Sequence, residues 1–151
     1  VKWILPPSPN YKLNIDGSYD PLTHNGGIGG VIRNHEGQWI LGYSKPLHHT
    51  TVLQAELLAL LHGLQLAIAH RLLPLTVESD SQVLMTLLPY GNPKYSHLFH
   101  VCRLMLHDLH VPQINHIYRE GNTVADALTH FGKKLCLSQH TDVLLFDNPP
   151  P

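Results

Sequence analysis

The stretch TVLQAELLALLHGLQLAIAHR, residues 51–71, decides the fold class because it predicts one long helix. Thr51 is followed three residues later by Gln54, a spacing typical of a helix N-terminus where both side chains bind free backbone amides. Pro74 sets the other limit, because the residue before a proline is disfavoured in the helical conformation. We therefore expect a helix from about residue 52 to Arg71.

Shorter segments on both sides of this helix have the alternation of β-strands or the period of helices. Strands are predicted at residues 11–16, 28–33, 38–44, 75–79 and 113–118, and further helices at residues 83–88, 98–109 and 123–135. Residues 34–37 are turn formers and predict a hairpin. The order βββαβααβα indicates an α/β fold in which helices flank a five-stranded mixed sheet.

Composition indicates one globular domain. The chain has 151 residues, of which 43% are apolar and 14% charged. Residues 1–10 hold three prolines and predict an extended lead-in, residues 11–135 the domain, and residues 136–151 a tail without a clear period. The start lacks an initiator Met and resembles a piece of a longer chain. We expect no membrane contact, and two cysteines favour an intracellular, nuclear or cytoplasmic, protein.

Glu56 is the most informative residue of the long helix. At about 100° per residue it points with Val52, Ala59, Gly63 and Ala67, on the small, apolar face that packs on a sheet. A carboxylate there costs several kcal/mol unless it is paired or bound to a metal. A buried ion pair with Arg or Lys, or an acid favoured by the helix dipole, would explain Glu56 equally well.

Three further acids lie at the ends of predicted elements. Asp16 ends the first strand, Asp80 follows the strand at 75–79, and Asp126 lies in the first turn of the last helix. Each has an ordinary alternative: an Asp-Gly turn, an N-cap, and an acid at a helix N-terminus. Together with Glu56, however, they would converge at one end of the sheet. Four close carboxylates repel unless cations separate them, which predicts Mg²⁺ or Mn²⁺.

Five short motifs resemble type 1 ribonuclease H. They are Asp16-Gly17-Ser18, residues 30–33 (GVIR) with Gly37, residues 54–60 (QAELLAL), residues 78–81 (ESDS), and residues 119–122 (REGN) with 125–128 (ADAL). More narrowly, they are similar to the plant domains at the C-termini of non-LTR retroelement reverse transcriptases, as is the opening from Trp3 to Asn14. The resemblance covers residues 3–135 in family order.

The resemblance implies a role for each matched residue. Asp16, Glu56, Asp80 and Asp126 match metal-binding acids that hold two ions, with Asp16 bridging them and Glu56 near the scissile phosphate. Two ions about 3.5–4 Å apart can activate a water and stabilise the leaving oxygen of a phosphodiester. The implied substrate contacts are Gly17 and Ser18 on the RNA strand, Thr51 on a DNA phosphate, Ser81 and Gln82 in the minor groove, and Asn122.

Some features depart from the family. Val52 and Leu53 replace polar contacts, and the basic protrusion of bacterial members is absent because residues 89–96 hold one lysine. The loop that carries a mobile histidine before the last acid is too short here, so Arg119 is the candidate to replace that histidine. The net charge of −1 is low for a nucleic-acid binder, and substrate binding by the isolated domain should be weak.

Two classes of function follow. The first is an endonuclease that hydrolyses the RNA strand of RNA–DNA hybrids with two metal ions, as one part of a reverse transcriptase polyprotein. The alternative is a catalytically weak or inactive nucleic-acid-binding domain of the same fold. Retention of all four acids favours the first, because a decayed site has no reason to keep carboxylates that repel one another.

Overall fold

The structure is a computed structural model that describes residues 2–111, 113–138 and 141–150. Its strands are β1 (Tyr11–Asp20), β2 (Asn25–Arg33), β3 (Trp39–His48), β4 (Leu75–Ser79), β5 (Asn115–His116) and β6 (Leu144–Phe146). Its α-helices are α1 (Val52–Ala69), α2 (Gln82–Leu87), α3 (Ser96–Asp108) and α4 (Thr123–Lys134). Short 3₁₀ turns form η1 (Pro93–Tyr95), η2 (Arg119–Gly121) and η3 (Leu135–Leu137).

The strands form one mixed sheet in the order β5-β4-β1-β2-β3-β6. Strands β1, β2 and β3 form an antiparallel meander, whereas β4 and β5 join the other side of β1 in parallel. The α/β class and the order of elements are therefore as the sequence predicts. The sheet has six described strands where five were expected, because β6 comes from the tail and pairs antiparallel with β3.

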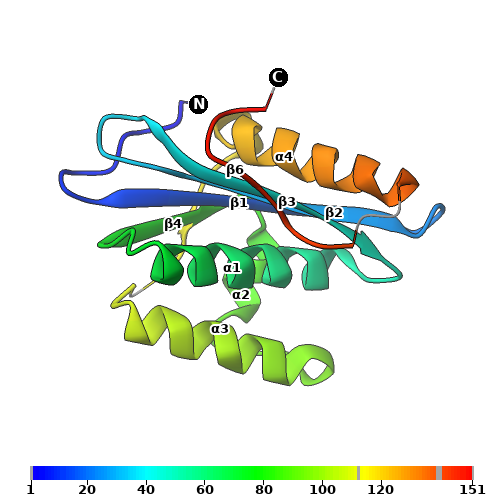
Figure 1. Ribbon diagram of the computed structural model, residues 1–151. Helices are drawn as coiled ribbons and strands as arrows, with labels where there is room; N and C mark the ends of the chain where they lie inside the picture. Colours follow the sequence, from blue (N-terminus) through cyan, green and yellow to red (C-terminus); the bar gives the residue numbers. More distant parts are fainter. Residues whose placement is uncertain (1, 112, 139–140, 151) are drawn as a thin grey trace.

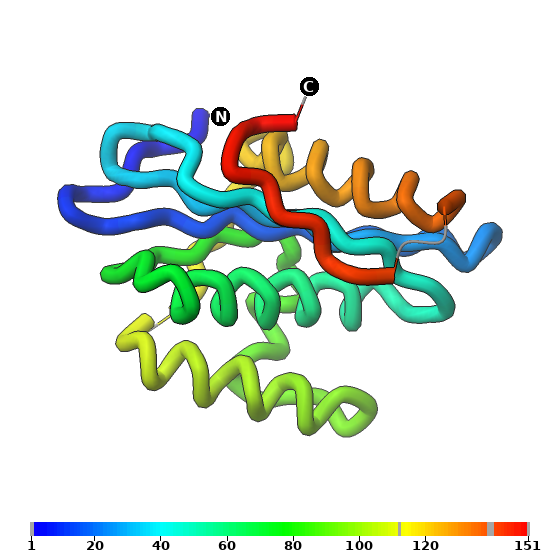
Figure 2. Tube along the Cα trace, viewed as in Figure 1, coloured from blue at the N-terminus to red at the C-terminus, as the bar shows by residue number. Residues whose placement is uncertain are grey.

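Helices cover both faces of this sheet (Figure 1). Helix α4 lies on one face, α1 lies on the other, and α3 packs on the outside of α1 as a further layer. The tube in Figure 2 shows the tail crossing in front of the sheet toward α4. Strand β3 contacts both helices through neighbouring residues: Tyr43 donates to the Ala59 carbonyl of α1 at 2.5 Å, and Ser44 donates to the Leu128 carbonyl of α4 at 2.6 Å.

The main core lies between the sheet and α1. Leu13 and Ile15 of β1 are fully buried there, and Leu57, Leu60 and Leu64 of α1 pack with them. By length and composition, α1 is the one helix among the described residues that could cross a membrane. It is instead the central helix of the fold, enclosed between the sheet and α3.

Several boundaries differ from the expectation. Gly17 and Ser18 do not end β1, which continues to Asp20, and β5 has two residues where six were predicted. The lead-in, residues 2–10, lies against the domain: the Lys12 ammonium donates to the Ile4 carbonyl at 2.6 Å. Val52 is 53% exposed and does not share the buried face of Glu56, because it begins α1 beyond the part that contacts the sheet.

Candidate metal centre

Three acids meet at one end of the parallel strand pair. One carboxylate oxygen from each of Asp16, Glu56 and Asp80 lies within 4.8 Å of the other two. The pairing of Ile15 with Ser79 explains two of them, because Asp16 and Asp80 directly follow this pair on neighbouring parallel strands. The prediction that these acids converge is confirmed for these three.

Gly17 brings the third acid to this position. A Cβ atom at Gly17 would lie 2.6 Å from the Ala55 carbonyl carbon and 2.7 Å from the Glu56 amide nitrogen. Only glycine therefore allows β1 and α1 to approach this closely. The ordinary alternative, in which Asp16-Gly17 forms a turn, is therefore wrong. Gly17 is instead the place where β1 contacts the backbone of α1.

Glu56 is buried without a counter-charge. Its residue exposure is 2%, and its Oε1 is one of the few buried polar atoms of the described residues that have no hydrogen-bond partner. The Ser79 hydroxyl reaches Oε2 only at 3.5 Å, at the limit of a hydrogen bond. Among the described residues no lysine or arginine forms a salt bridge with Glu56, so the alternative of a buried ion pair is wrong.

Burial and mutual repulsion disfavour the charged forms of all three acids. Burial, with the nearby Asp80 charge, raises the pKa of Asp16 to about 7. Burial, with the charges of Asp16 and Asp80, raises the pKa of Glu56 to about 9. Burial also raises the pKa of Asp80, although Arg119 and the Asn122 side chain act in the opposite direction. Without a cation, this site therefore holds its acids in an unfavourable state.

Asp126 lies at the edge of this group. It is not one of the three acids within 4.8 Å, and its side chain is 42% exposed. It is still within hydrogen-bonding reach of Asp16, and its charge acts on Asp80. Of the four acids predicted to converge, three form a compact group, Asp16, Glu56 and Asp80, referred to below as the acid triad. Asp126 lies beside this group.

The donor set fits a hard divalent cation. All ligand atoms are carboxylate oxygens, the donors that Mg²⁺ and Mn²⁺ prefer. The unpartnered Oε1 of Glu56 and the mutual repulsion of the three acids are both relieved by a cation between them. The acid triad can therefore hold a metal ion, and Asp126 is close enough to take part.

The predicted substrate contacts around this centre differ in their burial and in their hydrogen bonds. Gly17 is buried against α1, Ser18 next to it has a buried hydroxyl without a partner among the described residues, and Gln82 is exposed at the start of α2. Ser81 caps α2 by accepting from the Leu84 amide at 3.1 Å. Asp80 is therefore not the cap of α2, which leaves its carboxylate for the acid triad.

Thr51 has two partners. Its hydroxyl accepts from the Gln54 amide at 3.1 Å, as the predicted cap, and lies 2.7 Å from the Tyr95 hydroxyl of η1. Sequence reasoning missed Tyr95, because residues 44 positions apart share no local pattern. Arg119, in η2, is exposed and its charge lowers the pKa of Asp80, so it lies at the rim of the acid triad.

Asn122 differs most from its predicted role as a substrate contact. It precedes α4 but its side chain makes no capping hydrogen bond, and it is 1% exposed. Its amide instead binds the Ile15 carbonyl at 2.9 Å and the Asn14 side chain at 3.1 Å. Sequence reasoning missed Asn14, although its position two residues before Asp16 places both side chains on the same face of β1.

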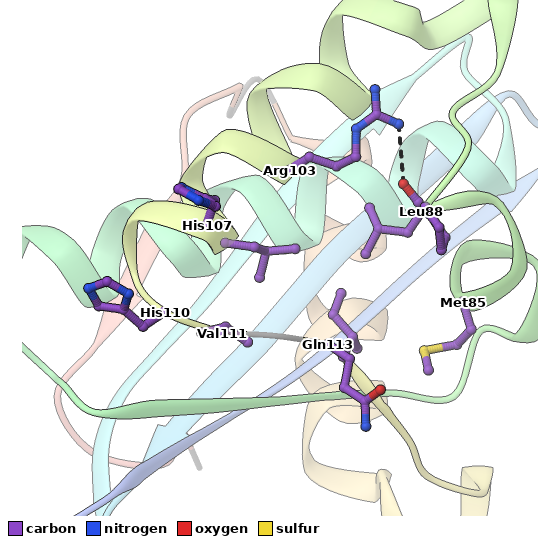
Figure 3. Close-up of a pocket in the computed structure, with 10 residues that line it drawn as sticks. Met85, Leu88, Arg103, His107, His110, Val111 and Gln113 are labelled. Atoms are coloured by element: carbon purple, nitrogen blue, oxygen red, sulfur yellow. Dashed lines mark hydrogen bonds between the residues drawn. The ribbon is translucent and has the colours of Figure 1, made fainter.

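A separate groove lies elsewhere on the domain. It has a volume of about 710 Å³ and opens between α2, the end of α3 and the segment before β5, and the acid triad does not line it. Figure 3 shows its lining, with Met85 and Val111 facing the groove and the Arg103 guanidinium donating to the Leu88 carbonyl at 3.2 Å. Its described lining mixes apolar side chains with Arg103, His107, His110 and Gln113 and includes no carboxylate, and we assign the function to the acids.

Known proteins similar to this chain share this architecture. The sequence model of the family described as reverse transcriptase-like matches residues 14–132. A protein of Arabidopsis thaliana named a putative ribonuclease H protein is 30% identical over 97% of this chain, and the chain spans only 24% of that relative.

Solved structures show the same fold. The RNase H domain of rv2228c from Mycobacterium tuberculosis is 19% identical with a TM-score of 0.75, over 86% of this chain and 97% of that one. LC11-RNase H1, isolated from compost and solved with an RNA/DNA hybrid, is 23% identical with a TM-score of 0.75, over 85% and 100%. The prototype foamy virus protease-reverse transcriptase is 23% identical with a TM-score of 0.65, over 85% and 21%. The chain therefore has the ribonuclease H fold and belongs to the reverse transcriptase-like family.

Proposed function

We propose that this domain is an endonuclease that hydrolyses the RNA strand of RNA–DNA hybrids, with two divalent metal ions, Mg²⁺ or Mn²⁺. The observation that carries the proposal is the acid triad itself: three carboxylates within 4.8 Å, with Glu56 buried and without a partner for Oε1. Such a cluster is unfavourable in a domain that only binds or connects, because its repulsion serves no purpose there.

The residues of the chain have separable tasks in this proposal. Asp16, Glu56 and Asp80 would hold one cation, and Asp126 with Asp16 would complete a second position. Bound divalent cations supply Lewis-acid activation of water and neutralise the charge that develops at a phosphodiester. The cleaved strand would keep a 5′-phosphate and a 3′-hydroxyl, and Arg119 at the rim would contact the phosphate group and assist product release.

Specificity for the hybrid would come from the surroundings of the acid triad. The backbone at Gly17 and Ser18 follows Asp16, and Ser81 and Gln82 follow Asp80, so both pairs would lie near the strand whose phosphate the acids hold. Recognition of 2′-hydroxyls there would select RNA as the cleaved strand. Thr51, at the N-terminus of α1, would bind a phosphate of the DNA strand. The hybrid in the compost enzyme's structure supports this substrate class.

The alternative is a hybrid-binding domain that does not cut. The net charge of −1 gives this alternative no support of its own, because free nucleic-acid binders usually carry a basic excess and a domain without bound cations would lack it. The parent reverse transcriptase polyprotein and its nuclear or cytoplasmic location are part of our proposal and await tests on the full-length protein.

The deciding experiment is a cleavage assay on the purified domain. Labelled RNA–DNA hybrid, double-stranded RNA and single-stranded DNA are incubated with Mg²⁺, Mn²⁺ or EDTA. We expect metal-dependent cutting of the RNA strand of the hybrid alone, and a loss of about 100-fold or more in D80N, since changes to the partners of metal ligands already cost about 10–100-fold and Asp80 would be a ligand itself.

The matched control is D108N. Asp108 is the last residue of α3, its side chain is 78% exposed, and it lies outside the acid triad. D108N removes the same charge and should cut like the wild type. Hybrid binding without metal-dependent cutting by the folded wild type would favour the non-catalytic alternative, and equal cutting of double-stranded RNA would indicate a different nuclease.

A further inference from the structure

The side chain of Asn14 uses its whole hydrogen-bonding capacity. Its Oδ1 accepts from the Trp3 indole at 2.7 Å and from the Arg33 guanidinium at 3.2 Å. Its Nδ2 donates to Glu78 Oε1 at 2.9 Å and to Asn122 Oδ1 at 3.1 Å. A side-chain amide has two acceptor positions and two hydrogens, so all four are occupied. Asn14 is fully buried, and it connects the lead-in to the start of α4.

The partners of Asn14 allow only one orientation of its amide. The indole N–H and the guanidinium can donate but cannot accept. Their side of Asn14 must therefore be the oxygen, and the NH₂ group must face Glu78 and Asn122. Trp3 is held in this place by Arg33, whose guanidinium lies 3.8 Å from the indole ring centroid.

This orientation is transmitted to Asn122. Because Asn122 Oδ1 accepts from Asn14, its NH₂ group faces the other way, where it donates to the Ile15 carbonyl at 2.9 Å. The Asn122 carbonyl accepts from the Asp126 amide at 3.0 Å, within the first turn of α4. One residue thus contacts the neighbour of Asp16 and the backbone of Asp126, and its side chain also lowers the pKa of Asp80.

We propose that Trp3 and Asn14 are positioning residues for the metal centre: they fix the amide of Asn122 so that its NH₂ group holds the Ile15 carbonyl, directly before Asp16. This inference rests on the proposed metal-dependent function. Asn122 is then a positioning residue as well, and not the substrate contact that its motif implies. The lead-in becomes a functional part of the domain, although it contributes no residue to the acid triad.

The hydrogen bonds from Trp3 through Asn14 to Asn122 are referred to below as the relay. The opposite orientation of the Asn122 amide shows why the relay matters. A reversed amide would place Oδ1 against the Ile15 carbonyl, a contact between two acceptors in a buried place. Buried acceptors without donors are costly, so the end of β1 at Ile15 and Asp16 would move away from Asn122. This change would disturb the ligands of a metal, as changes in the partners of metal ligands generally do.

The first test is N14D, which keeps the shape of the side chain and removes both donors. The ionised carboxylate can still accept from Trp3 and Arg33, but it cannot donate to Asn122 and it repels Glu78. We expect Mn²⁺ affinity, measured from the free Mn²⁺ signal in electron paramagnetic resonance, to fall about tenfold. Hybrid cleavage should lose kcat while KM for the hybrid changes less than about twofold. Mn²⁺ affinity within twofold of the wild type would overturn the inference.

The second test is a double-mutant cycle between Trp3 and Asn122, which also covers the case that N14D does not fold. W3F keeps an aromatic ring over Arg33 and removes only the indole donor. We expect W3F to weaken Mn²⁺ binding in the wild type and to have no further effect in N122A, where the relay is already interrupted. Equal effects of W3F in both backgrounds would contradict a relay.

Two controls separate this inference from simple loss of stability and from failure of the proposed function. C102A removes a buried side chain that contacts Leu57 and lies outside the relay, so it should lower stability without changing Mn²⁺ affinity. Hydrogen exchange of the Asn122 side-chain amide needs no metal: protection in the wild type should fall in W3F and N14D. A wild type that binds no Mn²⁺ would sink the proposed function, whereas unchanged exchange in both variants would sink the relay.

Discussion

The backbone of Gly17 lies against the backbone of Glu56, so that an added Cβ at Gly17 would come within 2.7 Å of the Glu56 amide nitrogen. This contact fixes the distance between β1, which carries Asp16, and α1, which carries Glu56. The Gly17 amide also favours the charged forms of both acids, since it lowers the pKa of each. A glycine that forms no turn is therefore part of the metal centre.

We predict that G17A separates the two acids. The added Cβ atom would clash with backbone atoms of α1, and no side-chain rotation can relieve this clash. Such overpacking costs about 1–3 kcal/mol. The unfolding temperature should fall and Mn²⁺ affinity should fall with it. G91A is the control, because Gly91 has a positive φ of 83° and lies outside the acid triad. It should lower stability without weakening Mn²⁺ binding; equal Mn²⁺ affinity in G17A and G91A would contradict the prediction.

We predict that E56Q stabilises the metal-free domain while it abolishes cutting. Glutamine has no charge to bury and removes the repulsion with Asp16 and Asp80. At pH 8 in EDTA, the unfolding temperature of E56Q should exceed that of the wild type by about 3 °C or more, since each kcal/mol shifts a domain of this size by about 2–4 °C. Mg²⁺ should raise the unfolding temperature of the wild type more than that of E56Q, which keeps only the position of Asp16 and Asp126. A metal-free E56Q less stable than the wild type would argue against an unfavourable Glu56.

For the same variant we predict a pH dependence of defined sign. The pKa of Glu56 is about 9 in the folded state and 4.5 in the reference state, so the folded state binds the proton more tightly. Below pH 4.5 Glu56 is protonated in both states, and its ionisation does not reduce the free energy of unfolding. This free energy decreases as pH rises from 4.5 toward 9, because the unfolded state gives up the proton first. The difference in unfolding temperature between E56Q and the wild type should therefore increase from about pH 5 to about pH 8. A constant difference across this range, measured in EDTA, would disagree with the raised pKa.

Much of this centre could be predicted because its residues lie at element ends that have strong local signals. Asp80 follows a short apolar strand and precedes a capped helix, and Glu56 interrupts the apolar face of a long helix. These patterns place two acids without knowledge of tertiary contacts. The convergence of the acid triad then follows from the parallel pairing of β1 with β4.

What the sequence could not predict depends on contacts between distant residues. Gly17 looks like a turn glycine until α1 is placed against it, and Asn122 looks like an N-cap until Asn14 occupies its side chain. Asp126 lies further out than its motif suggests, because α4 packs on the opposite face of the sheet from α1. In each case a tertiary contact replaces the local role that the residue type favours.

We predict that D126N removes one of two metal ions. Asp126 is outside the acid triad and half-exposed, so the other three acids can still hold a cation without it. Mn²⁺ titrations should show two ions bound to the wild type, one to D126N and none to D16N. Asp16 is decisive because it belongs to the acid triad and also lies within hydrogen-bonding reach of Asp126. D108N should bind two ions as well. Loss of both ions in D126N would mean that the acid triad alone does not form a site.

We predict, finally, that β6 contributes stability and no chemistry. The tail has no periodic pattern, yet Phe146 accepts from the Trp39 indole through its carbonyl at 2.8 Å and packs edge-on against Phe131 of α4 at 5.5 Å between ring centroids. F146A removes the ring contact and part of the apolar cover of β3, at a cost of about 1–3 kcal/mol, which lowers the unfolding temperature by several degrees. L137A, a substitution of an 85% exposed side chain in η3, should leave it unchanged. Both variants should bind Mn²⁺ as tightly as the wild type, because β6 pairs with β3 at the edge of the sheet and is separated from β1 by β2 and β3. A fall in Mn²⁺ affinity in F146A alone would show that the tail is coupled to the acid triad through α4, the helix that carries both Phe131 and Asp126.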